Sequence, residues 1–118
     1  MPYHPNNSSA VHQDTFAEFI RAPITGELRD IPGIGPAAIT KLADGEESIT
    51  TSYQLFGKYL SLKGEEIETK EHCDRFWSWL QAKGVNSHRS AIVMAIAQKC
   101  EVMFPDTYDE SIYEDEEA

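Results

Sequence analysis

The residues best suited to chemistry lie between Ile31 and Leu42, in the stretch IPGIGPAAITKL. Gly33 and Gly35 permit backbone conformations that are closed to other residues, and they let a ligand approach the main chain closely. A helix is expected to follow, because Pro36 suits the first turn of a helix. The backbone N–H groups of the hairpin and the positive end of that helix would then point at one spot, which is the geometry of a phosphate-binding site.

The side chains around the glycines fit the same interpretation. Ile34 is predicted to anchor the hairpin in the core, and Leu42 to pack the following helix. Lys41 lies about one and a half turns into that helix and could reach a neighbouring phosphate. The alternative interpretation is a plain Gly-Pro turn between two helices that binds no ligand.

Other kinds of site find less support in the sequence. His72, Cys73 and the acids of residues 65–68 lack the convergent spacing of metal ligands, so we expect no metal and no cofactor. No Ser/His/Asp or Cys/His set is identifiable, and the chain has no room for a catalytic domain, so we expect no enzyme. Cys73 and Cys100 match no zinc or disulfide framework and are interpreted as reduced, semi-buried thiols.

Apolar spacing and capping residues predict the elements that position these residues. Stop signals at Pro23, Gly64, Gly84 and Pro105 delimit short helices, and no window shows the alternation of a strand. The sequence predicts an all-α fold, a compact bundle of five to six short helices that contains a helix-hairpin-helix motif. The expected helices cover residues 15–20, about 25–30 and 36–43, followed by one capped by Thr51 or Ser52, one capped by Thr69 and one capped by Asn86 or Ser87.

Charge divides the chain into three parts. The formal net charge is −10, with 20 acids and 10 bases, but residues 101–118 hold eight of the acids and no base. Residues 1–100 therefore carry a charge of only −2. We expect a flexible arm over residues 1–14, a helical domain over residues 15–104 and an acidic tail over residues 105–118. A near-neutral body is compatible with a polyanionic partner, whereas the tail should restrain binding to one.

A longer set of residues in the same order resembles the barrier-to-autointegration factor family. It comprises FIRAP at residues 19–23, the glycine stretch at 31–42, LFGKYLSLK at 55–63, FWSWL at 76–80 and GVNSHRS at 84–90. The resemblance spans roughly residues 15–104. It implies small all-helical homodimers in which each subunit binds double-stranded DNA through the hairpin, so that one dimer bridges two duplexes. It also implies chromatin compaction and a groove for LEM-domain proteins of the inner nuclear membrane.

The resemblance implies a set of DNA-binding residues and some departures from the family. Asn86 and Ser87 match the start of the last helix, which in the family also faces the DNA backbone. His88 stands where the family has a lysine, Ala91 where it has a DNA-facing arginine, and Thr15 where it has a lysine. Fewer cations then face phosphate, so we expect modest, salt-sensitive affinity without base specificity. The implied set is Gly33, Ile34, Gly35, Pro36, Ala37, Lys41, Asn86, Ser87, His88 and Arg89.

Two functions stay open at this stage. The first is sequence-independent DNA binding and bridging by a homodimer, with a chromatin or nuclear organisation role. The second is a protein-interaction module of the same fold that has lost DNA binding and engages a LEM-domain or histone-like partner. No apolar run is long enough to span a bilayer, and no secretory signal is visible. We therefore expect an intracellular protein of the nucleus and cytoplasm, without direct membrane insertion.

Overall fold

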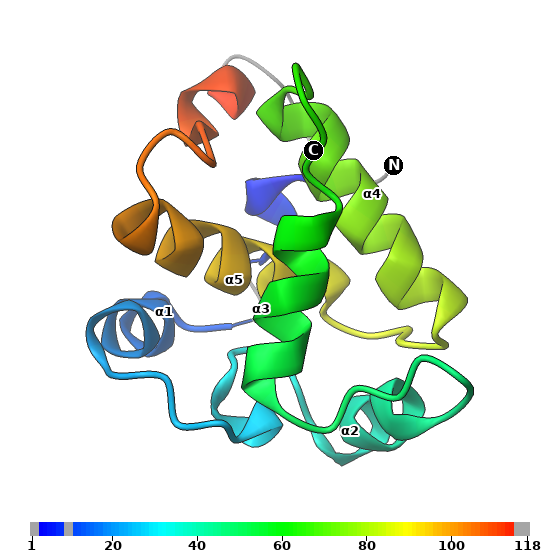
Figure 1. Cartoon of the computed structure of the whole chain (residues 1–118). Coiled ribbons are helices and arrows are strands. Elements are labelled where there is room, and N and C mark those ends of the chain that lie inside the picture. The colour runs from blue at the N-terminus through cyan, green and yellow to red at the C-terminus, as the bar shows by residue number, and fades with distance from the viewer. Residues whose placement is uncertain (1–2, 9–10, 115–118) are drawn as a thin grey trace.

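The computed structural model describes residues 3–8 and 11–114 and is all-helical, which confirms the predicted fold class (Figure 1). The described residues contain no strand. The radius of gyration of 13.1 Å is that of a single domain of this length. The elements are the α-helices α1 (Gln13–Arg21), α2 (Pro36–Ala43), α3 (Ser52–Ser61), α4 (Thr69–Ala82) and α5 (Arg89–Met103), and the 3₁₀ helices η1 (Pro5–Ser8), η2 (Leu28–Asp30) and η3 (Glu110–Tyr113).

Helix α5 lies at the centre of the fold and is buried on almost all sides. It contacts α1, α3, α4 and η1, which surround it (Figure 1). A helix that is apolar all round is stable only inside such a core, so α5 determines where its neighbours can lie. Seven of its residues are at most 1% exposed: Ala91, Ile92, Val93, Ala95, Ile96, Ala97 and Cys100.

Among the starts of α3, α4 and α5, one predicted cap is confirmed and two are wrong. Thr69 does not cap α4, because it is the first residue of the helix and Glu68 is at the N-cap position. Thr51 caps α3 and forms a capping box with Gln54, because each side chain bonds the backbone of the other residue. Helix α5 instead begins after His88, whose backbone is left-handed with a φ of 59°. Asn86 and Ser87 therefore belong to the connection between α4 and α5 and do not cap the helix.

The first two expected helices also differ from the prediction. Helix α1 begins at Gln13 rather than at residue 15, and His12 caps it by accepting the Asp14 N–H at Nδ1. The second expected helix is reduced to the single turn η2. Gly26 before it has a φ of 89°, and the Thr25 hydroxyl donates to the Asp30 carboxylate at 2.6 Å. These local interactions compete with a longer helix.

Both ends of the described chain pack on the core, which differs from the mobile arm and the separate tail expected from the sequence. The hydroxyl groups of Tyr3 and Tyr108 share a hydrogen bond of 2.6 Å. The ring of Tyr113 contacts the rings of Tyr3 and His4 edge-on. These three side chains and that of Tyr108 are buried. Single aromatic residues at irregular spacing give no helical period, so these contacts left no pattern in the sequence. Residues 105–114 thus pack with the folded domain, whereas residues 1–2 and 9–10 of the predicted arm and 115–118 of the predicted tail lie outside the described residues.

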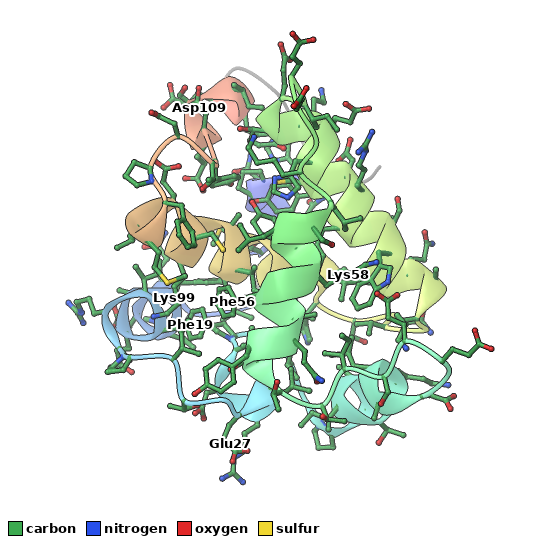
Figure 2. All side chains as sticks on the ribbon, viewed as in Figure 1. Phe19, Glu27, Phe56, Lys58, Lys99 and Asp109 are labelled. Carbon is green, nitrogen blue, oxygen red and sulfur yellow. The ribbon has the colours of Figure 1, made fainter. Side chains whose placement is uncertain are left out.

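Lys99 of α5 is a lysine buried inside the fold, with 4% of its surface exposed. Its ammonium group donates to the carbonyl oxygens of Phe19 at 2.6 Å, Ile20 at 3.2 Å and Ala22, where α1 ends. Figure 2 shows Lys99 beside Phe19 and Phe56, whose rings stack on each other. A cation in this position satisfies the open carbonyl groups and opposes the negative end of the helix dipole. Lys99 therefore fastens α1 to the central helix.

We expect Lys99→Met to lower the free energy of unfolding by about 2–4 kcal/mol, because it leaves three partly buried carbonyl groups without their donor. Lys63→Met is the matched control, since Lys63 donates to a single carbonyl, that of Ile67, at 3.3 Å. It should cost about 1 kcal/mol. Urea denaturation followed by circular dichroism measures both variants. Equal losses would contradict the role given to Lys99.

His72 of α4 is buried against α3. Its Nε2 donates to the carbonyl oxygen of Tyr59 at 2.6 Å, and its ring stacks on the Tyr59 ring with centroids 4.1 Å apart. Burial lowers the pKa of His72, which outweighs the hydrogen bond to the Tyr59 carbonyl. The imidazole is therefore held in its neutral form.

We expect the protein to lose stability as the pH falls below about 6.5, where His72 in the unfolded chain binds a proton. The folded chain takes up this proton only at lower pH, so the contribution is complete above pH ~6.5 and declines towards the folded-state pKa. Urea midpoints between pH 7.5 and pH 5 measure the slope. His72→Gln should flatten it, whereas His12→Asn, at an exposed histidine, should keep it. An unchanged slope in His72→Gln would sink the assignment.

The two cysteines are free and fully buried, deeper than the semi-buried positions predicted. Burial raises the pKa of the Cys73 thiol and of the Cys100 thiol to about 12. Neither sulfur is therefore poised as a nucleophile. None of the helices described here is long and apolar enough to cross a membrane.

Candidate nucleic-acid interface

The turn over residues 31–35 is held against the start of α5. Ile31 and Ile34 are buried beneath it, and the Ile34 N–H donates to the Ile31 carbonyl at 3.1 Å. Gly33 has a φ of 93°, and a Cβ atom there would lie 3.0 Å from Ile92 Cγ1 and 3.2 Å from Ala91 Cβ. Only glycine fits this position without strain, because both the φ angle and the space exclude a side chain.

The first turn of α2 presents backbone donors that have no partner. Gly35 is the N-cap residue, and no side chain caps the helix. The N–H groups of Gly35, Ala37 and Ala38 reach no acceptor among the described residues, and Pro36 has no N–H. A Cβ atom at Gly35 would meet nothing within 4 Å, so the approach to these donors is open. The positive end of the α2 dipole adds to their attraction for an anion.

The connection from α4 to α5 forms the opposite wall. Gly84 has a φ of 94°, and a Cβ atom there would lie 3.1 Å from Lys41 Cδ. The stem of Lys41 thus runs along Gly84 and joins the wall to α2. Helix α5 also lacks a side-chain cap, and the N–H groups of Ser90 and Ala91 have no acceptor within the described ranges. The N-termini of two helices therefore border the same space.

The two walls enclose a cleft of about 290 Å³. Among the described residues that line it there is no Asp or Glu, and Lys41 supplies a positive charge. Unpartnered N–H groups, two positive helix ends and an ammonium group favour an anion with several acceptor oxygens, such as a phosphodiester. The lining residues are Gly33, Gly35, Pro36, Ala37, Ala38, Lys41, Gly84, Val85, Asn86, Ser87 and His88.

The structure brings eight of the ten predicted site residues into this cleft and places two elsewhere. Ile34 lies in the core below the turn, where it anchors the site. Arg89 lines a neighbouring hollow that shares Asn86 and His88 with the cleft. Ala91, where the resemblance places a DNA-facing arginine, is buried against Gly33, so this position supports the turn.

Three residues that line the cleft were not predicted from the sequence: Ala38, Gly84 and Val85. Gly84 could have been predicted as a site residue, because a glycine that ends one helix shortly before the next can bring the two helices close together. Val85 is buried and its N–H donates to the Leu80 carbonyl at 3.0 Å, so it shapes the wall through its backbone. Nothing in the sequence distinguishes Ala38 from an ordinary helix residue.

The segment that follows α2 is fixed by a hydrogen-bonded network around Glu47. Its carboxylate accepts from Lys58 Nζ and from Trp79 Nε1, each at 2.9 Å, and Lys83 Nζ donates to its carbonyl at 2.7 Å. The hydrogen bonds from Lys58 and Trp79 lower the pKa of the Glu47 carboxyl group. The network joins this segment to α3 and α4, so α2 is anchored after its end as well as before its start.

We expect Gly33→Ala to lower the free energy of unfolding by about 1–3 kcal/mol, because the added Cβ is strained at this φ and crowds α5. Gly35→Ala is the matched control in the same turn. Its φ of −113° suits any residue and its Cβ meets nothing, so the change should stay within about 0.5 kcal/mol. Thermal and urea unfolding of both variants measure the difference. A Gly35→Ala variant as unstable as Gly33→Ala would overturn this description of the turn.

Comparisons with known proteins assign no family to the chain. No family model, curated protein or solved structure matches it. The resemblance to the barrier-to-autointegration factor family therefore stays a prediction from the residues. Over residues 3–8 and 11–114, no group of three or more His, Cys, Asp or Glu side chains could hold a metal ion.

Proposed function

We propose that the protein binds double-stranded DNA through the phosphate backbone, without base specificity, and bridges duplexes as a homodimer in a chromatin or nuclear organisation role. The observation that carries this proposal is the cleft between α2 and the residues before α5, where the unpartnered N–H groups of the first turn of α2 lie beside Lys41. Backbone donors recognise phosphate whatever the base sequence. A helix-hairpin-helix interpretation of η2, the turn and α2 supports the same function.

The acidic composition is compatible with this proposal because of where the acids lie. The described part of the tail, including η3 and Asp109, lies at the end of the molecule opposite α2 (Figures 1 and 2). Charges separated by more than about 8 Å are largely screened at physiological ionic strength. Glu101 carries out a structural task, since its carboxylate accepts the N–H groups of Asp106, Thr107 and Tyr108. Long-range repulsion should thus slow the approach of DNA without blocking the cleft.

A homodimer suits the bridging activity on geometric grounds. The cleft between α2 and the residues before α5 can hold one duplex, so bridging two duplexes needs a second copy of it. Twofold symmetry would give two equivalent clefts without a new kind of site. The dimer is part of the proposal and is tested with it.

The second candidate is a protein-interaction module, and one observation favours it. A wide groove of about 990 Å³ runs between the end of α3 and α4, with Leu62 and Trp79 among its apolar lining. Its charged lining holds four acids and two bases, which suits a basic peptide of the histone-like kind. A LEM-domain protein is the other partner proposed for a protein-interaction module. The acids of the groove are Glu66, Glu68, Glu71 and Asp74.

We expect the full chain to bind two fluorescent duplexes of unrelated sequence equally well, and more weakly at 200 mM than at 50 mM salt by about three- to fourfold for each phosphate contact. Gly35→Glu should abolish binding, because it places a carboxylate at the open mouth of the cleft. Gly35→Ala should bind within about threefold of the wild type, since its Cβ meets nothing. Fluorescence anisotropy measures these affinities, and light scattering measures the mass of the free protein.

Absence of saturable duplex binding at 50 mM salt would refute the proposal, and a monomer by light scattering would refute its bridging part. Energy transfer between two differently labelled duplexes tests the bridge itself. The full chain is the proper sample, because removal of residues 105–114 would strip Tyr108 and Tyr113 from the core. Binding of a lysine-rich peptide in place of DNA would favour the second candidate.

A further inference from the structure

A second hollow of about 250 Å³ lies beside the cleft, on the other side of Asn86 and His88, which line both. It is formed where three distant parts of the chain meet: η1, α4 and the start of α5. No Asp or Glu is found among the described residues that line it. The lining consists of Asn7, Trp77, Asn86, His88, Arg89 and Ser90.

Arg89 is held in a fixed orientation at this hollow. Its guanidinium carbon lies 4.1 Å from the centre of the Trp77 ring, and Nη1 donates to the Val85 carbonyl at 2.9 Å. Stacking on an aromatic face and one hydrogen bond fix the plane of a guanidinium group. Among the described residues Arg89 has no carboxylate partner, and its buried Nε has no acceptor. The charge is therefore oriented but not neutralised.

Ser90 gives a separate indication that the hollow takes a ligand. It is only 6% exposed and lines the hollow, yet its hydroxyl makes no hydrogen bond to any described residue. Its N–H, in the first turn of the 15-residue helix α5, has no acceptor there either. The rest of the residue is buried, so a ligand or water can reach this hydroxyl from the hollow that it lines. Hydroxyl, N–H and guanidinium donors beside one another favour a phosphate oxygen.

We propose that this hollow binds a second phosphate, next to the one held in the cleft, and that Trp77 is the residue that positions Arg89 for it. The inference rests on the proposed function, because the ligand is the phosphodiester backbone of the same nucleic acid. Arg89 then supplies a second cation besides Lys41, on the other side of Asn86 and His88. Trp77 acts through Arg89 and need not touch the nucleic acid.

The test compares the salt dependence of duplex binding across four variants of the full chain. Arg89→Ala should weaken binding at 50 mM salt about three- to tenfold and reduce the slope of log affinity against log salt by about one. Trp77→Leu should weaken binding and reduce the slope in the same way, because the guanidinium group loses the ring on which it stacks. Trp77→Phe keeps an aromatic ring and should largely retain the wild-type affinity and slope. The double variant Trp77→Leu/Arg89→Ala should be no weaker than Arg89→Ala alone, since both changes remove the same contact.

Phe76→Leu is the matched control on the same helix, because Phe76 is a buried aromatic residue that packs on Tyr59 and lines neither the cleft nor the hollow. It should lower the melting temperature and leave the salt slope unchanged. A purely structural role for Trp77 would give this same pattern in Trp77→Leu and would overturn the inference.

The outcomes separate this inference from the proposed function. If Gly35→Glu abolishes binding while Arg89→Ala keeps both affinity and slope, the second phosphate position falls and the proposed function stands. If the wild type binds no duplex, both fall. A loss of one unit of slope in Arg89→Ala and in Trp77→Leu, with the slope of Phe76→Leu unchanged, supports the inference.

Discussion

The burial of α5 is the constraint on which the rest of the structure depends. Because this helix is apolar on almost every side, each surrounding element must give it an apolar face. Its lysine would be very costly there without partners, and the open carbonyl groups at the end of α1 supply them. The same helix also supports the candidate site, since Ala91 and Ile92 form the surface on which the Gly33 turn lies.

The candidate site is a product of this packing rather than of any single motif. One wall comes from residues 33–41 and the other from residues 84–88, so the cleft exists only once α2, α4 and α5 are assembled. Anchoring before and after α2, by Ile34 and by the Glu47 network, keeps its N-terminus in place. Preorganised backbone donors lose little freedom when they bind an anion, which offsets the small number of cations.

The sequence allowed the fold class and most of the cleft to be predicted, because both leave local signals. Helical periodicity located the α-helices, and the pair Gly33 and Gly35 indicated a turn that exposes backbone donors. The sequence could not show that Arg89 turns away from the cleft towards Trp77, since this depends on the left-handed backbone at His88. Contacts between distant segments were equally invisible, as the partners of Lys99 and Tyr3 show.

The hydrogen bond between Tyr3 and Tyr108 joins the two ends of the described chain. The two residues are separated by 105 positions, yet their hydroxyl groups share one hydrogen bond, and the ring of Tyr113 contacts both Tyr3 and His4. Neither end can then fray alone, because peeling one segment from the core removes the partner of the other. Amide hydrogens near both ends should therefore exchange through the same cooperative opening, as parts of one folding unit.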